Sequence, residues 1–159
     1  MRIATILSVL FLISCASPST KDWNSLKNKE QHFFTEAKEK AIEEDAADGL
    51  LKSYTDFLAK HPNFEENPEI MLRQADVYLG LDKWFMALDV FNDFEKLYPD
   101  HKKVAFARFS KGLVCEMAFH RSGYYKHKDY SIAFYKEFLE KHPDHKLAES
   151  AKGSIQNMK

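Results

Sequence analysis

A motif of two aromatic residues and a proline occurs three times in the chain and constrains the fold more than any other feature. Its copies are Tyr54 to Pro62, Phe91 to Pro99 and Tyr135 to Pro143, with prolines 37 and 44 residues apart. In each copy the aromatic residues lie eight and five positions before the proline, which is an i, i+3 spacing on one helix face. A proline ends each helix because it cannot donate the next backbone hydrogen bond. Repetition at this period predicts a stack of helix pairs.

The middle copy carries further positions of the same pattern. Ala75, Tyr78 and Ala87 lie 24, 21 and 12 residues before Pro99. Small residues at Ala75 and Ala87 allow two antiparallel helices to approach closely, and Tyr78 and Phe91 are expected to fill the seam between them. These offsets resemble those of the tetratricopeptide repeat. The resemblance implies an all-α array of helix hairpins that binds other proteins.

One position at which the chain differs from the common repeat pattern narrows the resemblance to a subgroup of the family. Phe94 stands where the family often has alanine, and Tyr98-Pro99-Asp100-His101 follows it. This form is similar to the repeats of bacterial envelope proteins, namely the BamD-like outer-membrane assembly lipoproteins and the Tol-Pal-associated YbgF family. The resemblance covers roughly residues 45–158. BamD-like proteins carry more repeats than this chain can hold, and YbgF-like proteins generally lack a lipid anchor.

The helical pattern predicts a short array of about three helix pairs and a C-terminal capping helix, and the resemblance implies that this array is tetratricopeptide-like. The predicted helices are 23–43, 46–60, 67–80, 83–97, 101–120, 129–141 and 145–158. Asn67-Pro68 resembles a helix start, and Asp82 and Asp129 are expected to cap the helices that follow them. The last helix places Leu147, Ala151, Ile155 and Met158 on one apolar stripe. Such a terminal helix would cover the final repeat.

The first fifteen residues resemble a lipoprotein leader. An apolar run from Ile3 to Ile13 spans only ~16 Å, which is too short to cross a bilayer and fits a signal peptide. It ends in Leu12-Ile13-Ser14-Cys15, a match to the bacterial lipobox. We therefore predict a signal peptide over 1–14, a lipidated Cys15 with a tether over 15–22, and a helical-repeat domain over 23–159. Ala16 favours the outer membrane, facing the periplasm. The alternative is an ordinary signal peptide with an incidental cysteine.

Little in the sequence points to catalysis or to a bound cofactor. The seven histidines include no His-x₃-His pair, and Cys115 lies among apolar residues, so we predict no metal and a buried thiol. Paired carboxylates such as Glu43-Glu44 and Glu65-Glu66 are typical of solvated helix surfaces. No nucleophile elbow or phosphate loop is present. The prediction is a protein that is not an enzyme and needs no cofactor.

The charges are balanced overall but unevenly distributed. The chain has a net charge of −1, which argues against nucleic-acid partners. Residues 29–76 hold twelve acids and six Lys or Arg, whereas residues 101–128 hold seven Lys or Arg and one acid. Such asymmetry can steer a charged partner. Equally, neighbouring helices can neutralise each other.

The longer spacing before Pro143 leaves seven additional residues, which we place near His120–Lys128. Gly123 can end a helix there, and Tyr124 and Tyr125 cannot both face one helix seam, so at least one should be accessible. Exposed tyrosine beside arginine is typical of binding anchors. We therefore predict a partner-binding surface formed by Arg121, Tyr124, Tyr125, Lys126 and Lys128. The alternative is that both rings fold back over the final helix pair.

Together these features predict a membrane-anchored scaffold for other envelope proteins, in outer-membrane assembly or Tol-Pal-type maintenance. Its partners would be envelope proteins and the membrane itself, through the lipid. The alternative is a lipoprotein that binds a small molecule, a metal or a cell-wall polymer.

Overall fold

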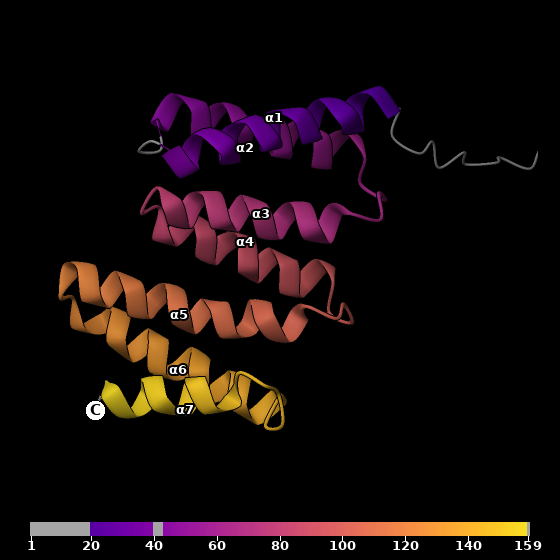
Figure 1. The fold of residues 1–159 in the computed structure, drawn as a ribbon. Helices are drawn as coiled ribbons and strands as arrows, with labels where there is room; N and C mark the ends of the chain where they lie inside the picture. The colour runs from indigo at the N-terminus through magenta and orange to yellow at the C-terminus, as the bar shows by residue number, and fades with distance from the viewer. Residues whose placement is uncertain (1–19, 40–42, 159) are drawn as a thin grey trace, which may run out of the picture.

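The computed structural model describes residues 20–39 and 43–158, and within these ranges every regular element is an α-helix. The helices are α1 (Thr20–Glu39), α2 (Glu44–Lys60), α3 (Asn67–Gly80), α4 (Trp84–Leu97), α5 (Val104–Ser122), α6 (Tyr125–Lys141) and α7 (Ala148–Asn157). They stack in chain order, and each packs mainly on its sequence neighbours (Figure 1). The predicted all-α helical-repeat array is confirmed. The leader, Cys15 and Ala16 lie outside the described residues.

The proline motif builds the same turn in all three copies. The residue before each proline has φ between −128° and −139° and ψ between 57° and 60°. Its N–H donates to the carbonyl oxygen four residues earlier, over 2.8–2.9 Å. Two further backbone hydrogen bonds follow at three-residue steps. In the first copy, the Phe64 N–H donates to the His61 carbonyl and the Asn67 N–H donates to the Phe64 carbonyl. Each helix pair is thus joined to the next by a six-residue loop, 61–66, 98–103 or 142–147.

Three rings hold each of these turns against the core. The second aromatic of the motif contacts the ring before the proline and a ring three residues later, with centroids 4.7–5.7 Å apart. The three sets are Phe57 with His61 and Phe64, Phe94 with Tyr98 and His101, and Phe138 with His142 and His145. The rings before the prolines are therefore packing residues, as the exchange of tyrosine and histidine in the sequence indicates.

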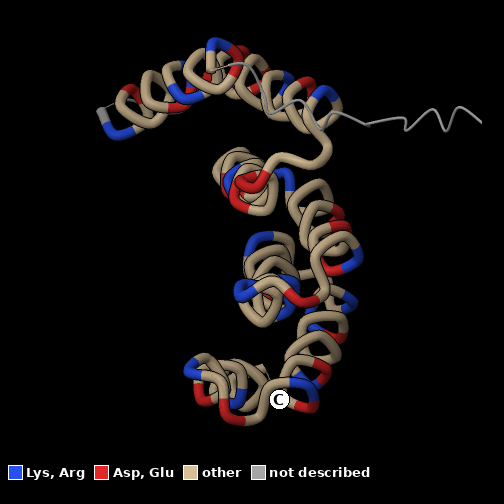
Figure 2. The backbone as a smooth tube through the Cα atoms, turned by 90° about the vertical axis from the view of Figure 1, so that its right-hand side faces the viewer, with Lys and Arg blue, Asp and Glu red and all other residues tan. Residues whose placement is uncertain are grey.

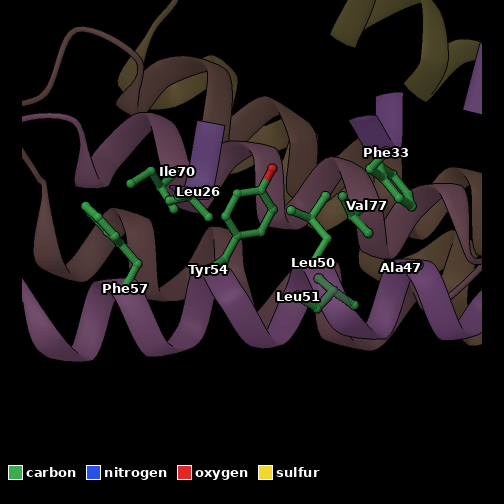
Figure 3. Packing of buried hydrophobic residues seen from close by; sticks show 9 residues of the cluster. All are labelled: Leu26, Phe33, Ala47, Leu50, Leu51, Tyr54, Phe57, Ile70 and Val77. Carbon is green, nitrogen blue, oxygen red and sulfur yellow. The ribbon is translucent and has the colours of Figure 1, made fainter. Parts of the chain in front are cut away.

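The motif aromatics form the centres of three successive core clusters. Phe91, Phe94, Ala75 and Ala87 are fully buried in the middle cluster, as predicted. Figure 3 shows the first cluster, where Tyr54 lies among apolar side chains of α1, α2 and α3. Burying a ring of this size stabilises the fold by about 1.5–3 kcal/mol.

The buried tyrosine hydroxyls each have a carboxylate partner. Tyr54 donates to Glu30 Oε1 over 2.6 Å, and Tyr135 donates to Glu116 Oε2 over 2.7 Å. Burial raises the pKa of both hydroxyls, and the hydrogen bonds to the carboxylates raise it further. Phe91 occupies the same position in the middle copy and needs no such partner.

Close approach of α5 and α6 depends on two small residues. A Cβ atom at Gly112 would lie 2.6 Å from the Tyr135 ring, so no larger residue fits there. The Ser131 hydroxyl, which is fully buried, donates to the Gly112 carbonyl over 2.8 Å. Ser131, which lies 12 residues before Pro143, thus takes the role that Ala87 has one repeat earlier.

Helix α7 covers the end of the stack. Ala151 and Met158 are buried against Phe109, Tyr135 and Phe138, and Leu147 and Ile155 pack beside them. The predicted stripe is therefore confirmed. The seven additional residues lengthen the third pair, because α5 and α6 have 19 and 17 residues where α3 and α4 have 14 each.

Several predicted helix starts are wrong. Asn67 is not the cap of α3, because Glu66 takes that position and the Asn67 side chain donates to the His61 carbonyl. Asp82 has no side-chain cap bond to α4, and Asp129 lies inside α6, which begins at residue 125. Helices α5 and α7 begin three residues later than predicted, because the repeated turn occupies the residues after each proline. Helix α1 begins at Thr20, inside the predicted tether.

Candidate functional site

A glycine makes the sharp reversal at the end of the third hairpin. Gly123 ends α5 with φ 67° and ψ 5°, and its N–H donates to the Phe119 carbonyl over 2.7 Å. This left-handed conformation strains any residue with a Cβ atom. Tyr124 is already the residue that flanks the start of α6, so the loop between the two helices has only two residues.

Four rings cluster beside this helix reversal, at the starts of α4 and α6. Tyr124 and Tyr125 are 45% and 61% exposed, with ring centroids 5.4 Å apart. Tyr124 also contacts His127 at 5.2 Å, and His127 contacts the exposed Phe85 of α4 at 5.8 Å. We call Phe85, Tyr124, Tyr125 and His127 the tip patch. It joins the start of α4 to the start of α6.

Basic side chains border the tip patch. Arg121 Nη2 lies 3.1 Å from Asp82 Oδ2 in the α3–α4 loop, in an ion pair exposed to solvent. Such a pair stabilises the fold by at most about 1 kcal/mol. Lys126 and Lys128 form no ion pair in the part of the chain that the structure describes, so their charges are available at this surface.

The five residues predicted as a partner-binding surface all lie within 121–128, at the end of α5 and the start of α6, and the rings of Tyr124 and Tyr125 are in contact. Both tyrosines are accessible, which confirms the expectation for at least one of them and contradicts the folded-back alternative. That they bind a partner stays a prediction. Sequence reasoning missed Phe85 and His127, although Phe85 lies two residues from the buried Ala87 and so had to face outward.

A second cluster of charges lies between α4, α5 and α6. Glu95 accepts hydrogen bonds from Arg108 Nε at 2.7 Å and Lys111 Nζ at 2.9 Å. Lys111 is only 7% exposed, and Arg108 also donates to His142 Nε2 over 2.8 Å. Lys141 lies 3.5 Å from the same carboxylate. We call Glu95, Arg108, Lys111, Lys141 and His142 the ion cluster.

The ion cluster shifts the titration of two of its members. Burial alone would raise the pKa of Glu95, but the hydrogen bonds from Arg108 and Lys111 outweigh it and hold the pKa at about 2. Burial lowers the pKa of His142, and the neighbouring Arg108 charge lowers it further. Both effects suit an ionised Glu95 and a neutral His142 that accepts from the guanidinium.

Much of the predicted charge asymmetry is neutralised between helices. Four of the seven basic residues in 101–128 pair with acids on other elements: Lys103 with Glu69, Arg108 and Lys111 with Glu95, and Arg121 with Asp82. Figure 2 accordingly shows both signs of charge within each helix pair. This favours mutual neutralisation over a strong field along the array, with Lys102, Lys126 and Lys128 as the exceptions.

The thiol of Cys115 is buried, as predicted, and burial raises its pKa to about 11. Among residues 20–39 and 43–158, no group of three or more His, Cys, Asp or Glu side chains is placed to hold a metal ion. No helix in this part of the chain is both long and apolar enough to cross a membrane.

Residues 69–101 match the tetratricopeptide repeat family. They comprise most of α3, all of α4 and the first four residues of the loop that follows, including the Phe94 ring set. No curated protein matches the chain. Tetratricopeptide repeats mediate protein–protein interactions, and the fold is typical of scaffolds without catalytic activity. The chain is an all-α helical-repeat array that contains a match to the tetratricopeptide repeat at its centre.

Proposed function

We propose that this chain is a lipid-anchored scaffold that binds other proteins of the bacterial cell envelope. The repeat match supports protein binding as the class of function. The leader that ends in Leu12-Ile13-Ser14-Cys15 supports attachment to a membrane through Cys15, and Ala16 supports the outer membrane. The resemblance to BamD-like and YbgF repeats supports a role in outer-membrane assembly or maintenance.

The tip patch is the observation that carries this proposal to named residues. Tyrosine is enriched at the centres of protein interfaces. Here Tyr124 and Tyr125 lie near Arg121 in the sequence, together with Lys126 and Lys128, which form no ion pair within the described residues. This chemistry fits an acidic protein surface, onto which the rings pack while the cations bind carboxylates.

The test is photocrosslinking in intact cell envelopes. A photoreactive residue at Lys126 should give discrete crosslinked bands, and the change of Arg121, Tyr124 and Tyr125 together to alanine should weaken them at least tenfold. Helicity and the melting temperature should change little, because these side chains are exposed.

The matched control places the same photoreactive residue at Lys152 of α7, which is exposed and lies outside the tip patch. Bands of equal strength from the triple variant would show that partners bind elsewhere. Loss of the folded state in that variant would instead place the rings in the core and remove this surface from the proposal.

A further inference from the structure

A groove of about 690 Å³ lies along α3, between α2 and α4. Its apolar lining comes from Leu58 of α2, Met71 and Tyr78 of α3, and Val90 and Leu97 of α4. Leu97 is 63% exposed, and Met86, which also lines the groove, is 50% exposed. Exposed apolar side chains gathered along one groove are typical of a binding surface.

The equivalent position one repeat later is filled by the ion cluster. A shift of 37 residues, the spacing of the first two prolines, takes Leu58 to Glu95, Met71 to Arg108 and Gln74 to Lys111. Glu95 and its two basic partners join α4 to α5 there. Between α2 and α3 the same three positions are occupied by Leu58, Met71 and Gln74, which are two apolar residues and an amide. The groove is thus open because these side chains leave it unfilled.

The charge of the groove has one sign. Asp89 and Asp93 are the charged side chains among the described residues that line it, and they lie one helical turn apart on α4. Asp89 has no ion pair within the described residues, and Asp93 pairs only with the exposed Lys96. An occupant should therefore bring positive charge.

The shape and polarity of the groove favour a helix over an extended strand. Its α3 side runs from Asn67 to Tyr78, a length of about 17 Å or three helical turns. Most of its surface is apolar, and two of its polar side chains, Gln74 and Thr55, already bond to each other over 3.2 Å. An extended segment would leave its backbone N–H and C=O groups without partners there, whereas a helix satisfies its own.

We propose that this groove binds a cationic amphipathic helix of a partner protein, with apolar side chains against Leu58 and Met71 and Lys or Arg beside Asp89 and Asp93. The proposal rests on the proposed function of protein binding, but it concerns a different surface from the tip patch. The two can fail separately.

The test uses a fluorescent helical peptide of about 14 residues, with leucines at one face and lysines at the flanks of that face. A second peptide has glutamates in place of the lysines. Binding is measured by anisotropy to the full chain carrying Cys15→Ser, which removes the predicted lipid and leaves the described residues unchanged. The lysine peptide should bind with a Kd below about 100 μM, and the glutamate peptide at least tenfold more weakly.

Two variants locate the binding. Asp89→Lys with Asp93→Lys should invert the preference between the peptides, because both side chains are exposed and their change should not disturb folding. The matched control, Asp144→Lys with Glu149→Lys, makes the same change in net charge in the last repeat and should leave binding unchanged. Leu58→Glu, Met71→Arg and Gln74→Lys together should fill the groove as the ion cluster does and abolish binding.

Equal binding of both peptides, or binding unchanged in the Asp89 and Asp93 variant, would overturn the proposal. Self-association of the chain that the filling variant abolishes would also overturn it, by making a second copy the occupant. The tip variant with Arg121, Tyr124 and Tyr125 changed to alanine should bind the lysine peptide normally. Envelope crosslinking by this variant that is as strong as that of the wild type would then count against the proposed function alone.

Discussion

At the scale of single residues, the same place in two repeats serves two opposite purposes. Leu58 and Glu95 both lie four residues before the proline of their copy. Leu58 lines an apolar groove, whereas Glu95 is the acceptor that keeps Arg108 and Lys111 paired in a largely buried site. A buried cation without its carboxylate is strongly destabilising, so the two basic side chains depend on Glu95 just as the ionised Glu95 depends on them.

The change Glu95→Gln should lower the free energy of unfolding at pH 7 by about 3 kcal/mol, the low end of the range for breaking buried pairs. The pKa of Glu95 is about 2 in the folded state against an ordinary 4.5. Its contribution is therefore complete above pH 4.5 and is lost as the pH falls towards 2. Urea unfolding should show the difference from wild type shrinking over that window.

Glu149→Gln provides the control, because Glu149 forms an exposed pair with Lys152. Its effect should stay within about 0.5 kcal/mol at both pH values. A difference for Glu95→Gln that is constant from pH 7 to pH 2.5 would show that the carboxylate charge does not stabilise the ion cluster.

At the scale of one element, α4 presents a buried face and an exposed face within 14 residues. Phe91→Ala or Phe94→Ala should each cost about 3–5 kcal/mol of stability, because a large cavity remains in the middle cluster. Ala87→Leu should cost about 1–3 kcal/mol by overpacking the close contact with α3. Thermal unfolding followed by circular dichroism measures all three.

Phe85→Ala is the matched control on the same helix, since the Phe85 side chain is exposed in the tip patch. It should change the melting temperature little. Destabilisation by Phe85→Ala as large as that of Phe91→Ala would contradict the assignment of the two faces.

Helical periodicity and the proline motif were sufficient to predict the elements and their cores. Phe91, Phe94 and Ala87 are buried as their spacing requires. The starts of α5 and α7 were missed because residues after each proline look helical, while the His101 and His145 rings fold back and accept from the backbone N–H two residues later. Glu95 could not be found, because its partners are 13 and 16 residues away and only packing brings them together.

At the scale of the whole molecule, the proposed attachment to a membrane depends on the side chain of Cys15, which directly follows the predicted signal peptide. Cys15→Ser should abolish incorporation of labelled fatty acid, because the thiol is the acceptor in a lipobox. Cys115→Ser is the control, since that thiol is buried in the described fold and should leave labelling intact. Equal labelling of the Cys15→Ser chain would contradict the lipoprotein assignment.

The three proline turns and the two hairpin ends lie on opposite edges of the stack (Figure 1). On one edge the loops 61–66, 98–103 and 142–147 have equal length and equal backbone geometry. On the other, the third hairpin extends further, because α5 is longer than α3 by five residues or about 7.5 Å. The edge with the proline turns therefore keeps the spacing of the helix pairs constant, whereas the hairpin edge varies in length. Residues can be added at a hairpin end, which moves its exposed rings further from the stack and leaves the spacing of the array unchanged.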